Sequence, residues 1–389
     1  MIGTDIREKS MIKQFIEQKE KKVEYAELVY DLIFVYIIGR NNALLHHTVG
    51  GYVTFDAFLM YLTCTLAVIQ IWNYTTYYIN GYGRNSVRDH VFLFSNMFLM
   101  YFLARGTDTE WQHYHTMYHI AWALILLNIG AQYLIERRRY ADDPVNRRRT
   151  SRMALILICE AVIVALAMVE FHFLGTTYAS LLAILLGMGS VFFLGKKKQT
   201  LCVDFEHLSE RVMLYVVFTF GEMIIAIGGY FDGEMNPRNL YFALMGFLIV
   251  VGLFLSYGVV YDRIIDREMK TNGLSYMFIH IFLIFALNNI TASLEFMQDE
   301  EIDLIQKMAF MVISLLVFFA SLFATGGYSK LKCRLTKGFV MTLVGISLVF
   351  AALMFLLREF PMVHIALTVI YVFAIFLIVR LNVRRSEQA

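Results

Sequence analysis

Hydrophobic residues are gathered in twelve long stretches that follow one another along almost the whole chain, with short polar connections between them. About 20 apolar residues are enough for an α-helix to cross the hydrocarbon core of a bilayer. The pattern therefore predicts an all-α integral membrane protein with twelve transmembrane helices and no separate soluble domain. The predicted helices cover residues 24–47, 55–80, 88–105, 111–136, 153–174, 176–194, 208–231, 238–262, 273–296, 302–325, 335–357 and 362–382.

Lysine and arginine residues are concentrated in every second connection and towards both ends of the chain. Connections of this kind stay in the cytoplasm, so both termini are expected to be cytoplasmic. Residues 1–23 are charged throughout and contain no signal peptide. The helical spacing of Ile12, Phe15 and Ile16 predicts a short amphipathic helix on the inner membrane surface. The basic segments are 1–23, 80–88, 136–152, 195–199, 262–270, 329–337 and 380–385.

Composition agrees with the membrane class. Of the 389 residues, 58% are hydrophobic and 17% are charged, a balance that soluble domains do not have. The net charge is only +2, and we expect membrane lipid rather than nucleic acid as the partner. Four cysteines are scattered between apolar runs and basic loops, so no disulfide framework is predicted.

The helices fall into two sets of six. Because six is an even number, both halves enter the membrane from the same side, which predicts two parallel repeats related by an axis along the membrane normal. The repeats are 24–194 and 207–382, joined by a cytoplasmic linker, 195–206, and followed by a cytoplasmic tail, 383–389. Aligning the first helix of each repeat places Gly39 level with Glu222, and the third helices place His90 opposite His280.

Three sequence motifs point to a known family. The first predicted helix contains ELVYDLIFVYIIG, the second contains IWNYTTYYINGYGR, and the seventh contains HLSERVMLYVVFTFGE. With these motifs the chain resembles the bacterial low temperature requirement A family over nearly its whole length. It departs from the family pattern at Tyr30, where Phe is usual, and at Phe220, where Leu is usual. The resemblance implies a multi-pass membrane protein associated with growth in the cold.

Several charged residues fall inside predicted membrane helices, where an isolated charge costs about 3 kcal/mol or more. Glu27 and Asp31 share one helix face, and the alignment of the repeats predicts that one of them contacts Arg211. A second pair, Arg40 with Glu222, is predicted nearer the outer side. Such pairs are either static structural latches or gating and proton-coupled groups; the third alternative is that the charges reach the interface without partners. The candidate charge network is Glu27, Asp31, Arg40, Glu160, Glu210, Arg211 and Glu222.

Other polar residues are expected in the membrane interior. His90, His280, Asn288 and Asn289 are candidates for a polar pathway, but the same residues could equally hold helices together through hydrogen bonds. His115 and His119 have a spacing that can bind a metal. No cysteine or nearby carboxylate completes such a site, so no metal or cofactor is predicted, and the histidines are more simply read as interfacial residues.

No motif in the sequence indicates catalysis, so the chain is not expected to be an enzyme. The buried acidic residues and the duplication favour a transporter of a small solute or lipid, coupled to protons, in the bacterial inner membrane. The alternatives are an ion or proton channel with its pore between the two repeats, and a membrane protein with a structural or sensory role. The sequence does not distinguish oligomeric states.

Overall fold

The computed structural model describes residues 22–106, 111–195, 203–231, 236–297, 301–330 and 336–388. The predicted amphipathic segment and most of the predicted linker lie outside these residues. The described part contains twelve α-helices, four short helical turns and one two-stranded hairpin. The α-helices are α2 (Tyr25–Asn41), α3 (Phe55–Tyr82), α4 (Val87–Gly106), α5 (Trp111–Arg139), α6 (Pro144–Leu174), α7 (Tyr178–Gly195), α8 (Phe205–Ile227), α9 (Pro237–Val259), α10 (Leu274–Phe296), α11 (Leu304–Ala324), α12 (Lys337–Leu356) and α13 (Pro361–Gln388).

Each predicted transmembrane stretch corresponds to one of these helices, which confirms the all-α membrane architecture. Ten of the described helices are long and apolar enough to cross a membrane. The other two are α4, which carries Arg88, Asp89 and Arg105 near its ends, and α7, whose described apolar part is shorter. The remaining elements are the turns η1 (Asn42–His46), η2 (Gly228–Phe231), η3 (Val260–Ile264) and η4 (Thr325–Tyr328), and the strands β1 (Thr48–Val49) and β2 (Tyr52–Val53).

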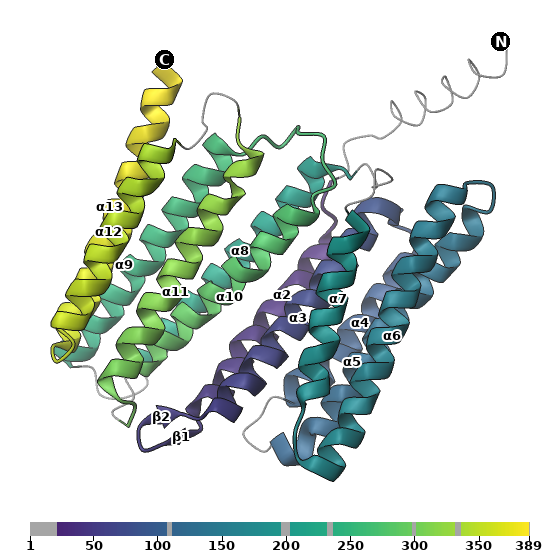
Figure 1. The fold of residues 1–389 in the computed structure, drawn as a ribbon, viewed down its shortest axis with the longest axis horizontal. Coiled ribbons are helices and arrows are strands. Elements are labelled where there is room, and N and C mark those ends of the chain that lie inside the picture. Colours follow the sequence, from purple (N-terminus) through teal and green to yellow (C-terminus); the bar gives the residue numbers. More distant parts are fainter. Residues whose placement is uncertain are drawn as a thin grey trace.

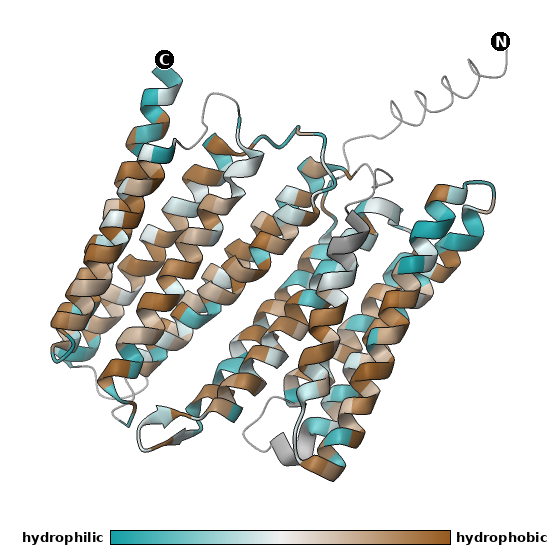
Figure 2. Cartoon of the chain, in the orientation of Figure 1, coloured by the Kyte–Doolittle hydropathy of each residue, from teal (hydrophilic) through white to brown (hydrophobic). Residues whose placement is uncertain are grey.

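The helices run side by side with their ends at two opposite faces (Figure 1). We call one of these the basic face, because α2 begins there, α13 ends there, and the arginine-rich ends of α5 and α6 lie there. The hairpin of β1 and β2 lies at the opposite face (Figure 1). Hydrophobic residues dominate the middle of the helices, whereas hydrophilic residues gather towards their ends (Figure 2).

Local sequence signals explain where several helices begin. Thr54, Asp143 and Asp204 stand just before α3, α6 and α8, and each side chain accepts a hydrogen bond from a backbone N–H of the first turn. These N–H groups have no partner within the helix, so a capping oxygen stabilises the first turn. Pro144 and Pro237 follow their caps at the start of α6 and α9, where a missing N–H costs nothing.

Two groups of helices meet along a central contact. In the first group α2 packs on α3 and α4, and α4 to α7 follow one another in sequence order. In the second group α8 packs on α9 and α10, while α13 packs on α9. Between the groups, α2 packs on α8, α3 packs on α8 and α10, and α7 touches α10. Glu27, Asp31 and Arg211 lie on the inner sides of α2 and α8 at this contact.

Candidate functional site

A buried ion-pair cluster joins the first helices of the two groups. The guanidinium of Arg211 on α8 donates through Nη1 to Oε2 of Glu27 at 2.8 Å and through Nη2 to Oδ1 of Asp31 at 2.5 Å. Both carboxylates belong to α2, and their separation of four residues brings them onto one face of that helix. The structure confirms the predicted contact of Arg211 with this face and shows that it includes both acids.

Aromatic and polar side chains surround this cluster. Trp72 on α3 donates its indole N–H to Oδ1 of Asp31 at 2.7 Å, and the Arg211 guanidinium lies 5.8 Å from the centre of the indole ring. The Tyr215 ring packs against Trp72 with centroids 4.5 Å apart. His207, one turn before Arg211, places Nε2 3.7 Å from Oε2 of Glu27. The cluster therefore ties α2, α3 and α8 together.

The cluster is almost completely closed to solvent. Arg211 and Asp31 are 0% exposed, and Glu27 is 5% exposed. A buried pair of this kind contributes little net stability because desolvation offsets the Coulomb attraction, but removal of one partner leaves an uncompensated buried charge. Oδ2 of Asp31 and Nε of Arg211 have no hydrogen-bond partner among the described residues.

A large polar cavity leads from the basic face to the edge of this cluster. We call it the vestibule; its volume is about 1160 Å³, and its lining includes Glu27, which is also the outermost acid of the cluster. Thr75, in its wall, hydrogen-bonds Tyr30 at 2.9 Å. The vestibule is lined by Lys22, Glu24, Ala26, Glu27, Thr75, Tyr78, Ile79, Asn80, Gly81, Tyr82, Gly83, Arg84, Asn85, Asp89, His90, Leu93, Asn96, Gln132, Tyr140 and Asp204. All but one of these belong to the first group of helices and their loops, so the vestibule does not lie between the two groups.

Glu160 on α6 forms a second buried polar cluster on another side of α3. Its Oε2 accepts a hydrogen bond from the Tyr74 hydroxyl at 2.7 Å, and the Gln70 amide lies 2.7 Å from the same hydroxyl and 3.1 Å from Oε1 of Glu160. All three side chains are buried. Gly187 of α7 lies against them so closely that a Cβ atom there would overlap each of the three. Within the described residues no Lys or Arg forms an ion pair with Glu160, unlike the acids beside Arg211.

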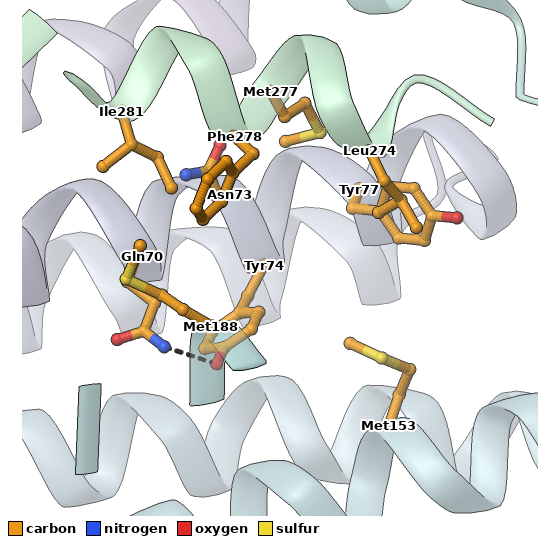
Figure 3. Close-up of a pocket in the computed structure, with 10 residues that line it drawn as sticks. All are labelled: Gln70, Asn73, Tyr74, Tyr77, Met153, Met188, Leu274, Met277, Phe278 and Ile281. Carbon is orange, nitrogen blue, oxygen red and sulfur yellow. Dashed lines mark hydrogen bonds between the residues drawn. The ribbon is translucent and has the colours of Figure 1, made fainter. Parts of the chain in front are cut away.

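A small cavity adjoins the Glu160 cluster at the contact between the two groups of helices (Figure 3). Its volume is about 60 Å³, and most of its wall is apolar. The polar residues Gln70, Asn73 and Tyr74 come from α3, and the hydrogen bond from Gln70 to Tyr74 lies at its edge (Figure 3). Nδ2 of Asn73 is buried without a hydrogen-bond partner in the part of the chain that the structure describes.

The predicted outer pair is only partly right. Glu222 does lie level with Gly39, because a Cβ atom on Gly39 would overlap its carboxylate. No ion pair between Arg40 and Glu222 is present among the described residues, and Arg40 instead lies on the exposed side of α2. The neighbours of Glu222 include Glu295, which in turn lies beside Asn42. The pair was predicted from height alone, because aligning two helices fixes their relative height but not the direction in which each side chain points.

The remaining predicted residues do not form one continuous path. His90 lines the vestibule, whereas His280 is buried on α10, with Nε2 3.4 Å from the Tyr257 hydroxyl. Asn288 and Asn289 both hydrogen-bond the Tyr61 hydroxyl, at 2.8 and 2.5 Å, and so connect α10 to α3.

Glu210 and the histidine pair also lie apart from the Arg211 cluster. Glu210 is half-buried and faces Tyr261 of η3. On α5, His119 uses one ring nitrogen for the carbonyl of His115 and the other for the Ser180 hydroxyl, both at 2.7 Å. Both nitrogens of His119 are therefore engaged within the protein, and His115 contacts Thr116 at 3.0 Å.

Sequence reasoning did not assign roles to the neutral members of these clusters. Trp72 and Tyr74 stand in the motif IWNYTTYYINGYGR, which carried the family resemblance, but nothing in their spacing connects them to acids on other helices. Nothing in the sequence around Gln70 or Gly187 indicated that either residue would contact Glu160. His207 opens the motif HLSERVMLYVVFTFGE, and its position one turn before Arg211 was the available clue.

The fold and the buried ion pairs define an α-helical, multi-pass membrane protein. Over residues 22–378 the chain matches the model of the bacterial low temperature requirement A protein (LtrA) family, and it belongs to that family. No match was found among curated proteins. The matched region includes the Arg211 cluster, the vestibule and the Glu160 cluster.

Proposed function

We propose that the protein is a proton-coupled transporter of a small polar solute in the bacterial inner membrane, with the basic face and both termini in the cytoplasm. The observation that carries this proposal is the vestibule of about 1160 Å³, which opens at one face and reaches a closed ion-pair cluster. A second cavity, at the opposite face, is lined by other residues, among them Gly51 and Asp303. A cavity open on one side only is what a transporter requires, whereas a channel needs a continuous hydrated path.

The lining of the vestibule favours a polar solute over a lipid. Asn96 and Gln132 offer amide donors and acceptors, and Arg84, Asp89 and His90 add ionisable groups near the entrance. A few convergent polar groups in a concave site are typical of small-molecule binding. Transport on this proposal involves no covalent chemistry.

A repeat of six helices supports the transporter proposal. We propose that α2–α7 and α8–α13 are parallel repeats, because α2 packs on α3 and α4 as α8 packs on α9 and α10, and α3 packs on α7 as α9 packs on α13. Both α2 and α8 continue into a short 3₁₀ turn. His90 and His280 each place Nδ1 within 2.9 Å of the carbonyl four residues earlier. Transporters built from such repeats move one half against the other.

The Arg211 cluster is suited to a gate in such a movement. It lies where α2 of one repeat meets α8 of the other, and its hydrogen bonds are made across that contact. Protonation of Glu27 or Asp31 would weaken the ion pairs and release α8 from α2. Solute binding at the end of the vestibule, next to Glu27, would act on the same contacts.

Reconstitution into proteoliposomes tests the proposal. A panel of amino acids, sugars and polyamines is added while a trapped pH-sensitive dye reports the internal pH. We expect proton movement only when a transported solute is added, and loss of this response in Asn96→Leu, which removes an amide from the vestibule. Ser95→Leu, on the exposed side of the same helix, is the matched control.

Two other outcomes would contradict the proposal. A proton or ion conductance that needs no solute would identify a channel. A complete absence of solute and ion movement, in protein that still restores growth in the cold, would favour a structural or sensory role.

A further inference from the structure

Two carboxylates near the ends of α8 and α10 have no basic partner. Glu222 and Glu295 are both partly buried and lie in the half of each helix that is further from the basic face. No Lys, Arg or His forms an ion pair with either acid among the described residues, whereas the acids beside Arg211 are both paired. An isolated charge at membrane depth is costly, so these two acids require a positive charge of another origin.

Both acids lie along one face of α2 and its continuation η1. A Cβ atom on Gly39 would overlap Oε1 of Glu222, so this carboxylate lies directly against the glycine. Glu295 lies beside the side chain of Asn42, three residues further on, where the backbone is still helical. Residues three apart are neighbours on a helix surface, with Cβ atoms about 5–6 Å apart. The two carboxylates are therefore about one helical turn apart, close enough for their charges to repel.

The Asn42 side chain points to a ligand at this position. It is 3% exposed, and neither its Oδ1 nor its Nδ2 has a hydrogen-bond partner of good geometry among the described residues, although Glu295 is its neighbour. Buried polar groups are nearly always hydrogen-bonded, so an amide with both ends unsatisfied requires an explanation. A positive ion that contacts the amide oxygen and both carboxylates explains the unsatisfied amide and the unpaired acids together.

We propose that Glu222, Glu295 and Asn42 form a binding site for a hard divalent cation such as Ca²⁺. Carboxylate and amide oxygens are the ligands that Ca²⁺ prefers, and its bonds to oxygen are about 2.3–2.6 Å long. One ion between the two acids therefore joins oxygens up to about 5 Å apart, which is close to the separation of one helical turn. A divalent ion also balances both negative charges.

The types of ligand at this position are unsuited to zinc. No group of three or more His, Cys, Asp or Glu side chains that could hold a metal ion occurs in the part of the chain that the structure describes. A zinc site needs three or four ligands of this kind. Ca²⁺ instead completes its coordination with amide and backbone oxygens and with water, and the partial exposure of Glu222 and Glu295 leaves room for water.

The nearby basic residues are directed away from the two carboxylates. Arg40 lies on the exposed side of α2, and the ring of His46, one turn after Asn42, packs edge-on against Phe296 with centroids 6.2 Å apart. The basic residues of α8 and α10 all lie in the first halves of these helices, while the site is in the second halves. They are His207, Arg211 and His280.

A cation at this site connects the two groups of helices on the side opposite the basic face. Asn42 belongs to the first group, and the two acids belong to the second. Here α2 packs on α8, and η1 packs on α10. An ion that binds all three residues therefore holds these contacts together. Because it binds the folded protein and not the unfolded chain, it raises the stability by mass action.

Thermal unfolding of the full chain in detergent tests the site, with Ca²⁺ as the probe. The protein is first treated with EGTA, and CaCl₂ is then titrated at constant ionic strength in NaCl. We expect a saturable rise in the melting temperature of wild type. Glu222→Gln and Glu295→Gln should each abolish this rise. Without Ca²⁺ each variant should be at least as stable as wild type, because the repulsion between the two carboxylates is removed.

Two further variants separate this site from general binding of cations at the surface. Asn42→Leu keeps the size of the side chain but removes the amide oxygen, so more Ca²⁺ should be needed for half of the maximal effect. Asp56→Asn is the matched control, because Asp56 is an exposed acid at the start of α3, beside the hairpin. It should retain the full response of wild type. Isothermal titration calorimetry should show one Ca²⁺ per chain in wild type and in Asp56→Asn.

Three outcomes would overturn the proposal. One is an equal response to Ca²⁺ in wild type and Glu295→Gln, and another is the absence of any response to Ca²⁺ or Mg²⁺. The third is stabilisation by acid alone, which would assign a shared proton to the two carboxylates. The inference goes beyond the proposed transport function and is independent of it, because none of these measurements involves the movement of a solute.

Discussion

The indole N–H of Trp72 donates to Oδ1 of Asp31 at 2.7 Å, the same oxygen that Arg211 contacts. One carboxylate oxygen thus accepts from two helices at once, while Oδ2 has no partner among the described residues. The geometry makes Asp31 the point at which α3 and α8 are both attached to α2. Loss of either donor is therefore expected to loosen more than one helix contact.

Arg211→Met should destabilise the folded protein strongly. The change leaves the Glu27 and Asp31 carboxylates buried without a cation, and breaking a buried ion pair in this way costs about 3–5 kcal/mol. The double variant Arg211→Met with Asp31→Asn should recover part of the loss, because one of the uncompensated charges is gone. Thermal unfolding in detergent measures both effects. An Asp31→Asn change that alters stability by the same amount in wild type and in Arg211→Met would show that Asp31 and Arg211 are not coupled.

Trp72→Phe should cost about 1.5–3 kcal/mol, the range for a hydrogen bond to a charged group. Trp122→Phe provides an internal comparison, because the Trp122 indole N–H is buried without a partner in the described structure. Removing that N–H is expected to be neutral or slightly stabilising. The two variants lose the same atoms, so a similar decrease in melting temperature for both would exclude a special contribution from the bond to Asp31.

Gly187→Ala should disrupt the Glu160 cluster, because the added Cβ overlaps Gln70, Tyr74 and Glu160. Either the three side chains or α7 itself must move, so we expect lower stability and loss of proton coupling. Gly189→Ala, two residues further along the same helix, meets nothing within 4 Å. Alanine is favoured over glycine inside a helix by about 1 kcal/mol, so this variant should be at least as stable as wild type. Equal tolerance of both substitutions would contradict the close contact.

Cysteine labelling tests the orientation and the vestibule together. Leu93→Cys, in the vestibule, and Val145→Cys, at the basic face, should react with a membrane-impermeant reagent only in inverted vesicles. Val49→Cys, in the exposed hairpin at the opposite face, should react in intact cells. Labelling of Val145→Cys in intact cells would reverse the proposed orientation.

The sequence was sufficient for the helices and for one site contact. Apolar stretches of sufficient length located all twelve described helices, because membrane insertion depends chiefly on local hydrophobicity. The contact of Arg211 with Glu27 and Asp31 followed from the alignment of two helices and from the high cost of an unpaired charge in the membrane. The same alignment placed Glu222 correctly beside Gly39 but assigned it the wrong partner, because rotation about the helix axis depends on neighbours that the sequence does not identify.

The Glu160 cluster could not be assembled in this way. Its members come from α3, α6 and α7, which have no common motif, and their meeting depends on how these helices pack. Gln70 and Tyr74 are neutral residues, and neutral polar residues carry no penalty large enough to require a particular partner. Only Glu160 was identifiable, as an acid in an apolar stretch.

Trp72 and Tyr74 lie two positions apart on α3, yet one contacts Asp31 and the other contacts Glu160. In an α-helix such residues differ in height by about 3 Å and point in nearly opposite directions. α3 therefore contacts a different buried acid on each of two opposite sides, and a sideways shift of the helix towards one acid carries it away from the other. We therefore expect substitutions at Trp72 and Tyr74 to have non-additive effects on stability, although the two side chains lie on different sides of the helix.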